Sequence, residues 1–222
     1  MATTLLQSLI LASAGILSVG SITLVILLLI SDRGWHNGLG YALGYTSAYT
    51  VIGVSVVTLG YRTAENNTDE PNIVLPIIMI VLGSLLIWLS LKNWRKPAPQ
   101  KKKEPRFFSI VNKITPLKAF GFGAMVSVIN FKNLALFLSA LSVVILSDLL
   151  ITEKITITLL VVLVFCLSVI IPVLIFVIFP QKANHVLNGI KETLEKNSRP
   201  IGIWLPLLFG LIFLLKGITG LL

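Results

Sequence analysis

Charged residues are scarce in this 222-residue sequence. Asp, Glu, Lys and Arg together make up 12% of it, about half of the share that is usual in soluble domains. Hydrophobic residues make up 55%, and the mean hydropathy is +0.94. A chain of this length and apolar character predicts an all-α integral membrane protein rather than a soluble protein with a large core.

Residues that carry catalysis or bind metals are also nearly absent. The sequence has one cysteine, Cys166, and two histidines, so an intrachain disulfide is excluded and no histidine pair has the spacing of a metal site. It contains no Walker loop, no HExxH and no GxSxG motif, and no carboxylate lies deep in an apolar segment. We therefore expect no enzyme, no cofactor and no metal, and ATP-driven transport would need a separate subunit.

Long apolar segments are what the sequence has instead. A membrane span takes about 20 helical residues, and six segments qualify: 5–30, 39–60, 73–91, 119–146, 155–179 and 201–222. The first has no basic residue before it and is too long for the apolar part of a signal peptide, so we expect it to be a retained transmembrane helix.

A basic, proline-containing loop, 92–118, divides the chain into two halves, 1–91 and 119–222, each with three predicted spans. Three crossings reverse the direction of the chain, so the halves must have opposite orientations. This predicts two inverted three-helix repeats, an arrangement that many transporters use.

Basic residues predict the sidedness. The net charge is +9, and 14 Lys and Arg lie in loops 31–38, 92–118 and 180–200, against two, Arg62 and Lys154, in the other loops. The positive-inside rule therefore places those three loops in the cytoplasm and both termini outside, in a bacterial inner or plasma membrane. This clustering indicates membrane lipids, and not nucleic acid, as the partner of the basic surface.

Loop 180–200 also has a helical pattern. An apolar stripe of Val186, Leu187, Ile190 and Leu194 alternates with lysines, which predicts an amphipathic helix on the cytoplasmic surface. Such basic segments favour anionic lipid, and simple anchoring of the topology is the alternative.

Lys132 departs from this distribution. It lies near the middle of segment 119–146, about 20 Å along the axis from either end, too far for its side chain to reach an interface. A lysine at that depth costs roughly 3 to more than 10 kcal/mol unless it faces a polar cavity or a partner. Asn130 and Asn133 flank it with donors and acceptors. We predict a substrate-binding site here; the alternative is a structural lysine bound to backbone carbonyls at a helix break.

The first segment has a matching interruption. Small and polar residues, Ser18-Val19-Gly20-Ser21, begin 13 residues after Leu5, and the run that starts at Asn130 begins 11 residues after Ala119. If both helices break there, the freed N–H groups add positive potential that suits a carboxylate, phosphate or sulfate. Ser18, Gly20 and Ser21 therefore join the predicted site, although ordinary small residues in an unbroken helix are the alternative. Asp32 is the nearest charge partner for Lys132, unless it only caps a helix.

The second segment carries two stripes at helical spacing. Gly40, Gly44 and Ala48 form a small-residue face that admits a neighbouring helix and leaves a homodimer open. Tyr41, Tyr45 and Tyr49 form the other stripe. Tyr41 fits an interfacial belt, whereas Tyr45 and Tyr49 are deeper and are assigned to the substrate site, with plain packing as the alternative. Pro172, central in the fifth segment, is expected to kink that helix and shape the cavity.

Several short motifs resemble a known family. Asn130-Phe131-Lys132-Asn133-Leu134 is similar to the Asn-Pro-Lys pattern in the fourth helix of the LysE superfamily of exporters. Leu17-Ser18-Val19, SDRGWHNG, YALGY, NWRK and IIPVLIFVIFP resemble its GAP branch, the glycopeptidolipid-addressing proteins related to mycobacterial sulfolipid-addressing proteins. Val19 and Phe131 stand where the family often has proline, which leaves open whether the two helices break.

The resemblance implies export of a small or amphiphilic solute, such as a glycolipid or its precursor, by alternating access at a central site. An alternative from another class is a non-transporting scaffold or assembly factor for a lipid synthesis or export complex, with the basic and amphipathic loops as docking surfaces. A third reading is an amino-acid or cation exporter, which a deep carboxylate would have favoured.

Overall fold

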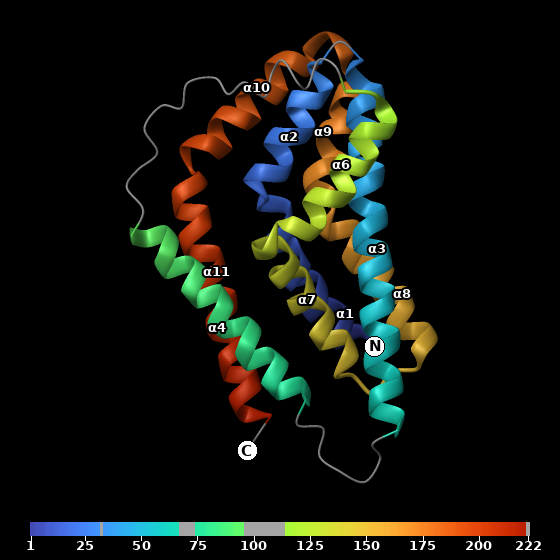
Figure 1. Cartoon of the computed structure of the whole chain (residues 1–222), viewed down its shortest axis with the longest axis vertical. Coiled ribbons are helices and arrows are strands. Elements are labelled where there is room, and N and C mark those ends of the chain that lie inside the picture. The colour runs from blue at the N-terminus through green and yellow to red at the C-terminus, as the bar shows by residue number, and fades with distance from the viewer. Residues whose placement is uncertain (32, 67–73, 96–113, 221–222) are drawn as a thin grey trace.

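The computed structural model describes residues 1–31, 33–66, 74–95 and 114–220, and every regular element in these ranges is helical. The elements are α1 (Ala2–Ala12), the 3₁₀ turn η1 (Ser13–Leu17), α2 (Val19–Leu29), α3 (Gly34–Asn66), α4 (Val74–Arg95), α6 (Pro116–Ile129), α7 (Phe131–Ile145), α8 (Ile151–Phe165), α9 (Leu167–Ile178), α10 (Pro180–Lys196) and α11 (Ser198–Thr219) (Figure 1). The predicted helical class is confirmed.

Two of the predicted spans break where their small and polar residues stand. The α1–η1 segment meets α2 at Ser18 with a bend of 55°, and α6 meets α7 at Asn130 with a bend of 73°. The two residues have nearly the same backbone angles, φ −74° and ψ 82° at Ser18 against φ −78° and ψ 76° at Asn130. This conformation is close to an inverse γ-turn and departs from the helical ψ. Both helices are therefore broken without the proline that the family often has.

A third break was not predicted. α8 and α9 meet at Cys166 with a bend of 59°. Pro172 lies six residues later, buried inside α9. Because proline has no N–H, it leaves the Ser168 carbonyl without its usual helical donor. The large change of direction in this span is thus at Cys166, and Pro172 modifies the helix that follows.

The number of spans depends on how the bent pairs are counted. By length and composition, one described helix can cross a membrane, residues Gly34–Tyr61, and the count rises to four if each bent pair crosses as one unit. The prediction of six spans in two inverted repeats, with division at loop 92–118, stays a prediction. Most of that loop, residues 96–113, lies outside the described ranges.

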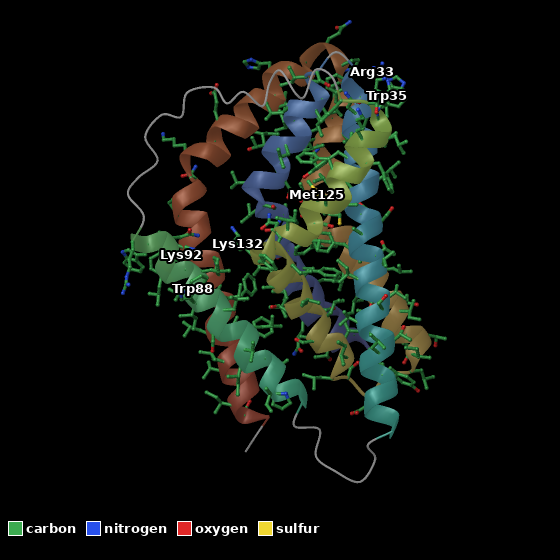
Figure 2. All side chains as sticks on the ribbon, in the orientation of Figure 1. Arg33, Trp35, Trp88, Lys92, Met125 and Lys132 are labelled. Carbon is green, nitrogen blue, oxygen red and sulfur yellow. The ribbon has the colours of Figure 1, made fainter. Side chains whose placement is uncertain are left out.

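The helices form a bundle with a separate pair beside it. α4 and α11 pack closely against each other and touch the bundle chiefly at α7 (Figure 1). The start of α3, the start of α6 and α10 lie at one end of the long axis, and the α7–α8 connection lies at the other (Figure 1). One described end of each basic loop therefore lies at the same end of the molecule as α10, whereas the end of α4, which begins loop 92–118, lies about midway along the long axis (Figures 1 and 2). Which compartment the basic loops face stays a prediction.

Glycines permit the close contact between α3 and α6. A Cβ atom added at Gly44 would lie 1.9 Å from the Phe120 carbonyl oxygen, and one added at Gly123 would lie 2.2 Å from that of Tyr41. Backbone packs directly on backbone here, as small residues allow in membrane proteins. The small-residue face that left a homodimer open is thus covered by α6 of the same chain, so a homodimer stays a prediction without that support.

The helix predicted in loop 180–200 is present as α10. Ala183 and Leu187 on its apolar side are fully buried, while Lys182 and Val186 are exposed. The helix packs against α2 and α9. The side of α10 with Ala183 and Leu187 therefore covers the end of the bundle, whereas Val186, a member of the predicted stripe, is exposed.

The α3–α6 contact generates a stability prediction. We expect Gly44→Ala to destabilise the protein by about 1–3 kcal/mol or more, because the added methyl group meets backbone that cannot yield easily. The matched control is Gly121→Ala in α6, where a Cβ would meet nothing within 4 Å, so the change should be neutral or stabilising by up to about 1 kcal/mol. Thermal inactivation of the detergent-solubilised protein, followed by size-exclusion chromatography, measures both. Equal midpoints for the two variants would contradict the close contact.

Candidate functional site

The breaks at Ser18 and Asn130 bring polar side chains together inside the apolar bundle. The Asn133 amide nitrogen donates hydrogen bonds to the Ser18 hydroxyl (2.5 Å) and to the Tyr45 hydroxyl (3.2 Å). Ser18 donates to Ser21 (3.0 Å), and Ser21 donates to Tyr45 (3.2 Å). We call Ser18, Ser21, Tyr45 and Asn133 the polar cluster. None of the four side chains is more than 3% exposed.

Local sequence explains how α7 starts there. Asn130 is the N-cap residue of α7, and its side-chain oxygen accepts a hydrogen bond from the Asn133 backbone N–H (3.4 Å). Asparagine is among the preferred N-cap residues, because its side chain replaces a missing helical acceptor. Asn130 therefore starts the second half of the broken helix, while the Asn133 side chain joins that helix to the break at Ser18. The two asparagines therefore have different roles, and their positions in the sequence alone did not distinguish these roles.

Lys132 lies beside the polar cluster but is not a member of it. The residue is in the first turn of α7 and is half-buried. Figure 2 shows its side chain pointing away from α3, toward the side of the molecule where α11 lies. Within the described part of the chain, no hydrogen bond or ion pair engages its ammonium group. The structural alternative, a lysine held by backbone carbonyls, therefore lacks its expected partners.

Apolar residues near Lys132 in the sequence are exposed. Phe131 is 68% exposed and Ile129 is 60% exposed. A Cβ added at Gly20, at the start of α2, would meet nothing within 4 Å. Gly20 is exposed, and a Cβ atom added there would not contact Lys132. An ammonium group next to exposed apolar side chains can bind an anionic group that carries an apolar chain.

The tyrosine stripe of α3 is entirely buried. Tyr41, Tyr45 and Tyr49 are each 0% exposed. The ring of Tyr49 packs against Phe137 (4.7 Å between centroids) and Phe165 (4.9 Å), and against Tyr45 (4.9 Å). The packing alternative therefore describes Tyr49 better than cavity lining does. The expectation that Tyr41 belongs to an interfacial belt was wrong, because α6 covers it through contacts such as that with Phe122 (5.8 Å).

Asp32, the predicted charge partner of Lys132, lies outside the described residues. The remaining predicted residues are placed as above: Ser18, Ser21, Tyr45 and Asn133 form one network, and Asn130 and Lys132 adjoin it. Gly20 and Pro172 have no side-chain donor or acceptor that could join the network, and the ring of Tyr49 packs against that of Tyr45.

Sequence reasoning assigned Lys154 to a loop, but the structure buries it. Its side chain is 4% exposed in the first turn of α8, and its ammonium donates a hydrogen bond to the Ile145 carbonyl (2.8 Å) at the end of α7. The same ammonium lies 5.5 Å from the centre of the Tyr61 ring. A cation at a helix C-terminus complements the partial negative charge there. The sequence signal for a helix start at this lysine was Thr-Glu-Lys directly before an apolar run. In the structure, Glu153 accepts a hydrogen bond from the Leu150 N–H (3.2 Å) at this helix start.

These features define the class of the protein. No group of three or more potential metal-ligating residues occurs in the described ranges. The chain is a helical membrane protein in which broken helices carry polar side chains into the middle of an apolar bundle.

The chain belongs to the sulfolipid-1-addressing protein (Sap) family, whose model matches residues 9–219. No curated protein and no solved structure matches the sequence. The family match confirms the resemblance to sulfolipid-addressing proteins and spans both broken helices. The wider placement in the LysE superfamily stays a prediction.

The polar cluster generates a second prediction. Asn133→Ala should lower the free energy of unfolding by about 1–3 kcal/mol, because two buried hydroxyls lose a hydrogen-bond partner. In a double-mutant cycle with Tyr45→Phe, we expect a coupling energy of at least about 0.5 kcal/mol, since the two side chains are in direct contact. Denaturant titration in mixed micelles measures both. Thr156→Ala, an exposed residue whose hydroxyl bonds only within α8 (2.9 Å), is the control. Strictly additive effects would rule out the Asn133–Tyr45 interaction.

Proposed function

We propose that this protein exports an amphiphile with an anionic head, such as a sulfated or phosphorylated glycolipid or its precursor. The head binds beside Lys132 at the broken helices, and alternating access carries the molecule outward. The name of the matching family, sulfolipid-1-addressing protein, supports a substrate of this class.

One observation carries this proposal: two helix starts and an unpaired ammonium converge at mid-bundle. α2 begins after Ser18 and α7 begins after Asn130, and the hydrogen bond from Asn133 to Ser18 holds these starts together. Each helix start presents partial positive charge from its free N–H groups. Lys132 adds a full charge at the same place. Positive potential in an apolar environment favours an anion strongly, because little water is present to screen it.

The apolar surroundings favour an amphiphile over a small free anion. Val128, Ile129 and Phe131 are each at least 50% exposed, and they flank Lys132 in the sequence. Acyl chains can cover these side chains while the head stays at the lysine. The pair of α4 and α11, which touches the bundle chiefly at α7, stands on the side toward which Lys132 points (Figure 2).

Alternating access is supported by the matching breaks. Ser18 and Asn130 share one backbone conformation at corresponding positions of the two predicted halves. The halves are not copies in every respect, because α3 is continuous over 33 residues whereas its counterpart is bent at Cys166. The proposal therefore needs the two breaks to act as equivalent hinges, and does not need strict symmetry elsewhere.

The second candidate function is a membrane scaffold for a lipid synthesis or export complex. The observation in its favour is that the polar cluster is closed, with side chains no more than 3% exposed and bonded to one another. A cluster that serves only to hold broken helices together would look the same. The unpaired Lys132 is what a static scaffold does not explain. The reading as an amino-acid or cation exporter has no deep carboxylate to support it.

Substitution of Lys132 separates these functions. In the native host, we expect Lys132→Ala and Lys132→Gln to reduce the exported lipid about tenfold or more at normal expression, because a charge-assisted contact to the head is lost. Lipid profiling of the cell surface and the cell interior measures this loss, with accumulation inside. The matched control is Lys118→Ala, which removes an exposed lysine at the start of α6. Wild-type export by both Lys132 variants would contradict the proposed role of Lys132 in binding the head group.

Reconstitution distinguishes the transporter from the scaffold. Purified protein in vesicles, with no other subunit, should move a fluorescent sulfated lipid between leaflets, and the Lys132 variants should not. Export that is normal in cells but absent in vesicles would favour the scaffold.

A further inference from the structure

A surface cavity lies at the far end of α2 from the polar cluster. It is an open hollow lined by the end of α2, the start of α3 and a side chain of α9, and has a volume of about 460 Å³. Its lining has an apolar part, Leu29, Ile30 and Phe176, and a polar part that includes Arg33, Trp35 and His36. We call it the α2–α3 cavity. α2 has 11 residues, so about 16 Å separates this cavity from Ser18.

The polar part of the cavity has the chemistry of an anion site at a membrane interface. Arg33 is exposed, and within the described ranges no carboxylate or carbonyl engages its guanidinium group. Trp35 is 44% exposed, and its ring lies 3.8 Å from that of His36. Figure 2 shows Arg33 and Trp35 together at one end of the molecule. A guanidinium can hold two oxygens of a phosphate or sulfate at once, and an indole N–H is a donor suited to the headgroup region.

Buried hydrogen bonds hold the turn that carries these residues. The Ser31 hydroxyl donates to the Leu28 carbonyl (2.6 Å) and accepts from the Asn37 amide (3.0 Å). Ser31 is 8% exposed and Asn37 is 0% exposed. Gly34 has a φ of +36° and donates to the Ser31 carbonyl (2.7 Å). Glycine is the residue that adopts positive φ without steric cost. Hydrogen bonds among Leu28, Ser31, Gly34 and Asn37 therefore hold described residues on both sides of Arg33.

We propose that the α2–α3 cavity binds the anionic head group of a membrane lipid. A phosphate or sulfate oxygen of the head contacts Arg33, and the first carbons of the lipid chains lie on Ile30 and Phe176. The apolar wall favours binding of a lipid over binding of a free anion. A free phosphate would contact one cation and could make no favourable contact with the apolar surface. The proposal holds whether the protein is a transporter or a scaffold.

Trp35 serves as a reporter for the test. The sequence has four tryptophans, so Trp88→Phe, Trp94→Phe and Trp204→Phe together leave Trp35 alone. The full-length triple variant is placed in nanodiscs of phosphatidylcholine that contain a minor fraction of brominated phosphatidylglycerol or of brominated phosphatidylcholine. Bromine quenches tryptophan emission on contact. We expect the anionic lipid to quench Trp35 several-fold more than the zwitterionic lipid at equal content, with the difference reduced by salt.

Variants of Arg33 decide whether the cavity causes that preference. Arg33→Gln should reduce the preference for the anionic lipid about tenfold, and Arg33→Lys should keep part of it, because the charge remains but the paired contact is lost. Arg95→Gln, an exposed arginine at the end of α4, is the matched control and should leave the preference intact. Equal quenching by the two lipids, or an unchanged preference in Arg33→Gln, overturns the proposal.

Inorganic phosphate distinguishes the two sources of the anion. At constant ionic strength, added phosphate should not reverse the quenching by brominated phosphatidylglycerol, because it lacks the apolar part that fills the cavity. Complete reversal at millimolar phosphate would assign the site to a free anion and overturn the lipid proposal.

Discussion

The rest of this structure depends on one constraint: backbone groups released at a helix break in an apolar environment must find partners within the protein. Two helices break at mid-bundle, at Ser18 and Asn130. At the second break the Asn130 side chain accepts a hydrogen bond from the Asn133 N–H, and side-chain hydrogen bonds of the polar cluster join the two breaks. Asn133 is central, because its backbone N–H bonds to the cap of its own helix and its side chain bonds to Ser18 and Tyr45. Polar side chains thus connect the two breaks where the surrounding side chains are apolar.

The packing of α6 on α3 places Tyr45 in this network. Gly44 and Gly123 let the two backbones touch, so the hydroxyl of Tyr45, one residue from Gly44, reaches Asn133 beyond the end of α6. A bulkier contact would move α6 outward and carry the Asn130 break with it. The glycine contact therefore positions the site as much as the polar residues do.

Two lysines show how differently the same residue can be accommodated. Lys154 is almost fully buried and bonds to the Ile145 carbonyl at the C-terminus of α7, which is a favourable place for a cation. Lys132 stands at the opposite end of α7, at the N-terminus, where the helix dipole is unfavourable for a cation, and no described residue engages it. The helix dipole disfavours a cation at this position, and the sequence nevertheless has a lysine there. We therefore infer that an anion from outside the chain binds the ammonium group. The proposed function rests on this contrast.

Hydrophobicity and spacing were sufficient to predict the helical membrane class and to mark the positions where two helices could break, because burial depth and helical face follow from position along the chain. They left open whether the helices break there, since neither position has a proline. They were insufficient wherever the outcome depended on a partner far away in sequence. The small-residue face of α3 could have met a second copy, and it meets α6 instead. The sequence favoured an interfacial position for Tyr41 and a loop position for Lys154. In the structure, α6 covers Tyr41, and the Lys154 ammonium bonds to the last carbonyl of α7. The bend at Cys166 had no signal in residue type at all. In each case, a residue's own chemistry limited its roles, and only the three-dimensional neighbours that completed its contacts selected one of them.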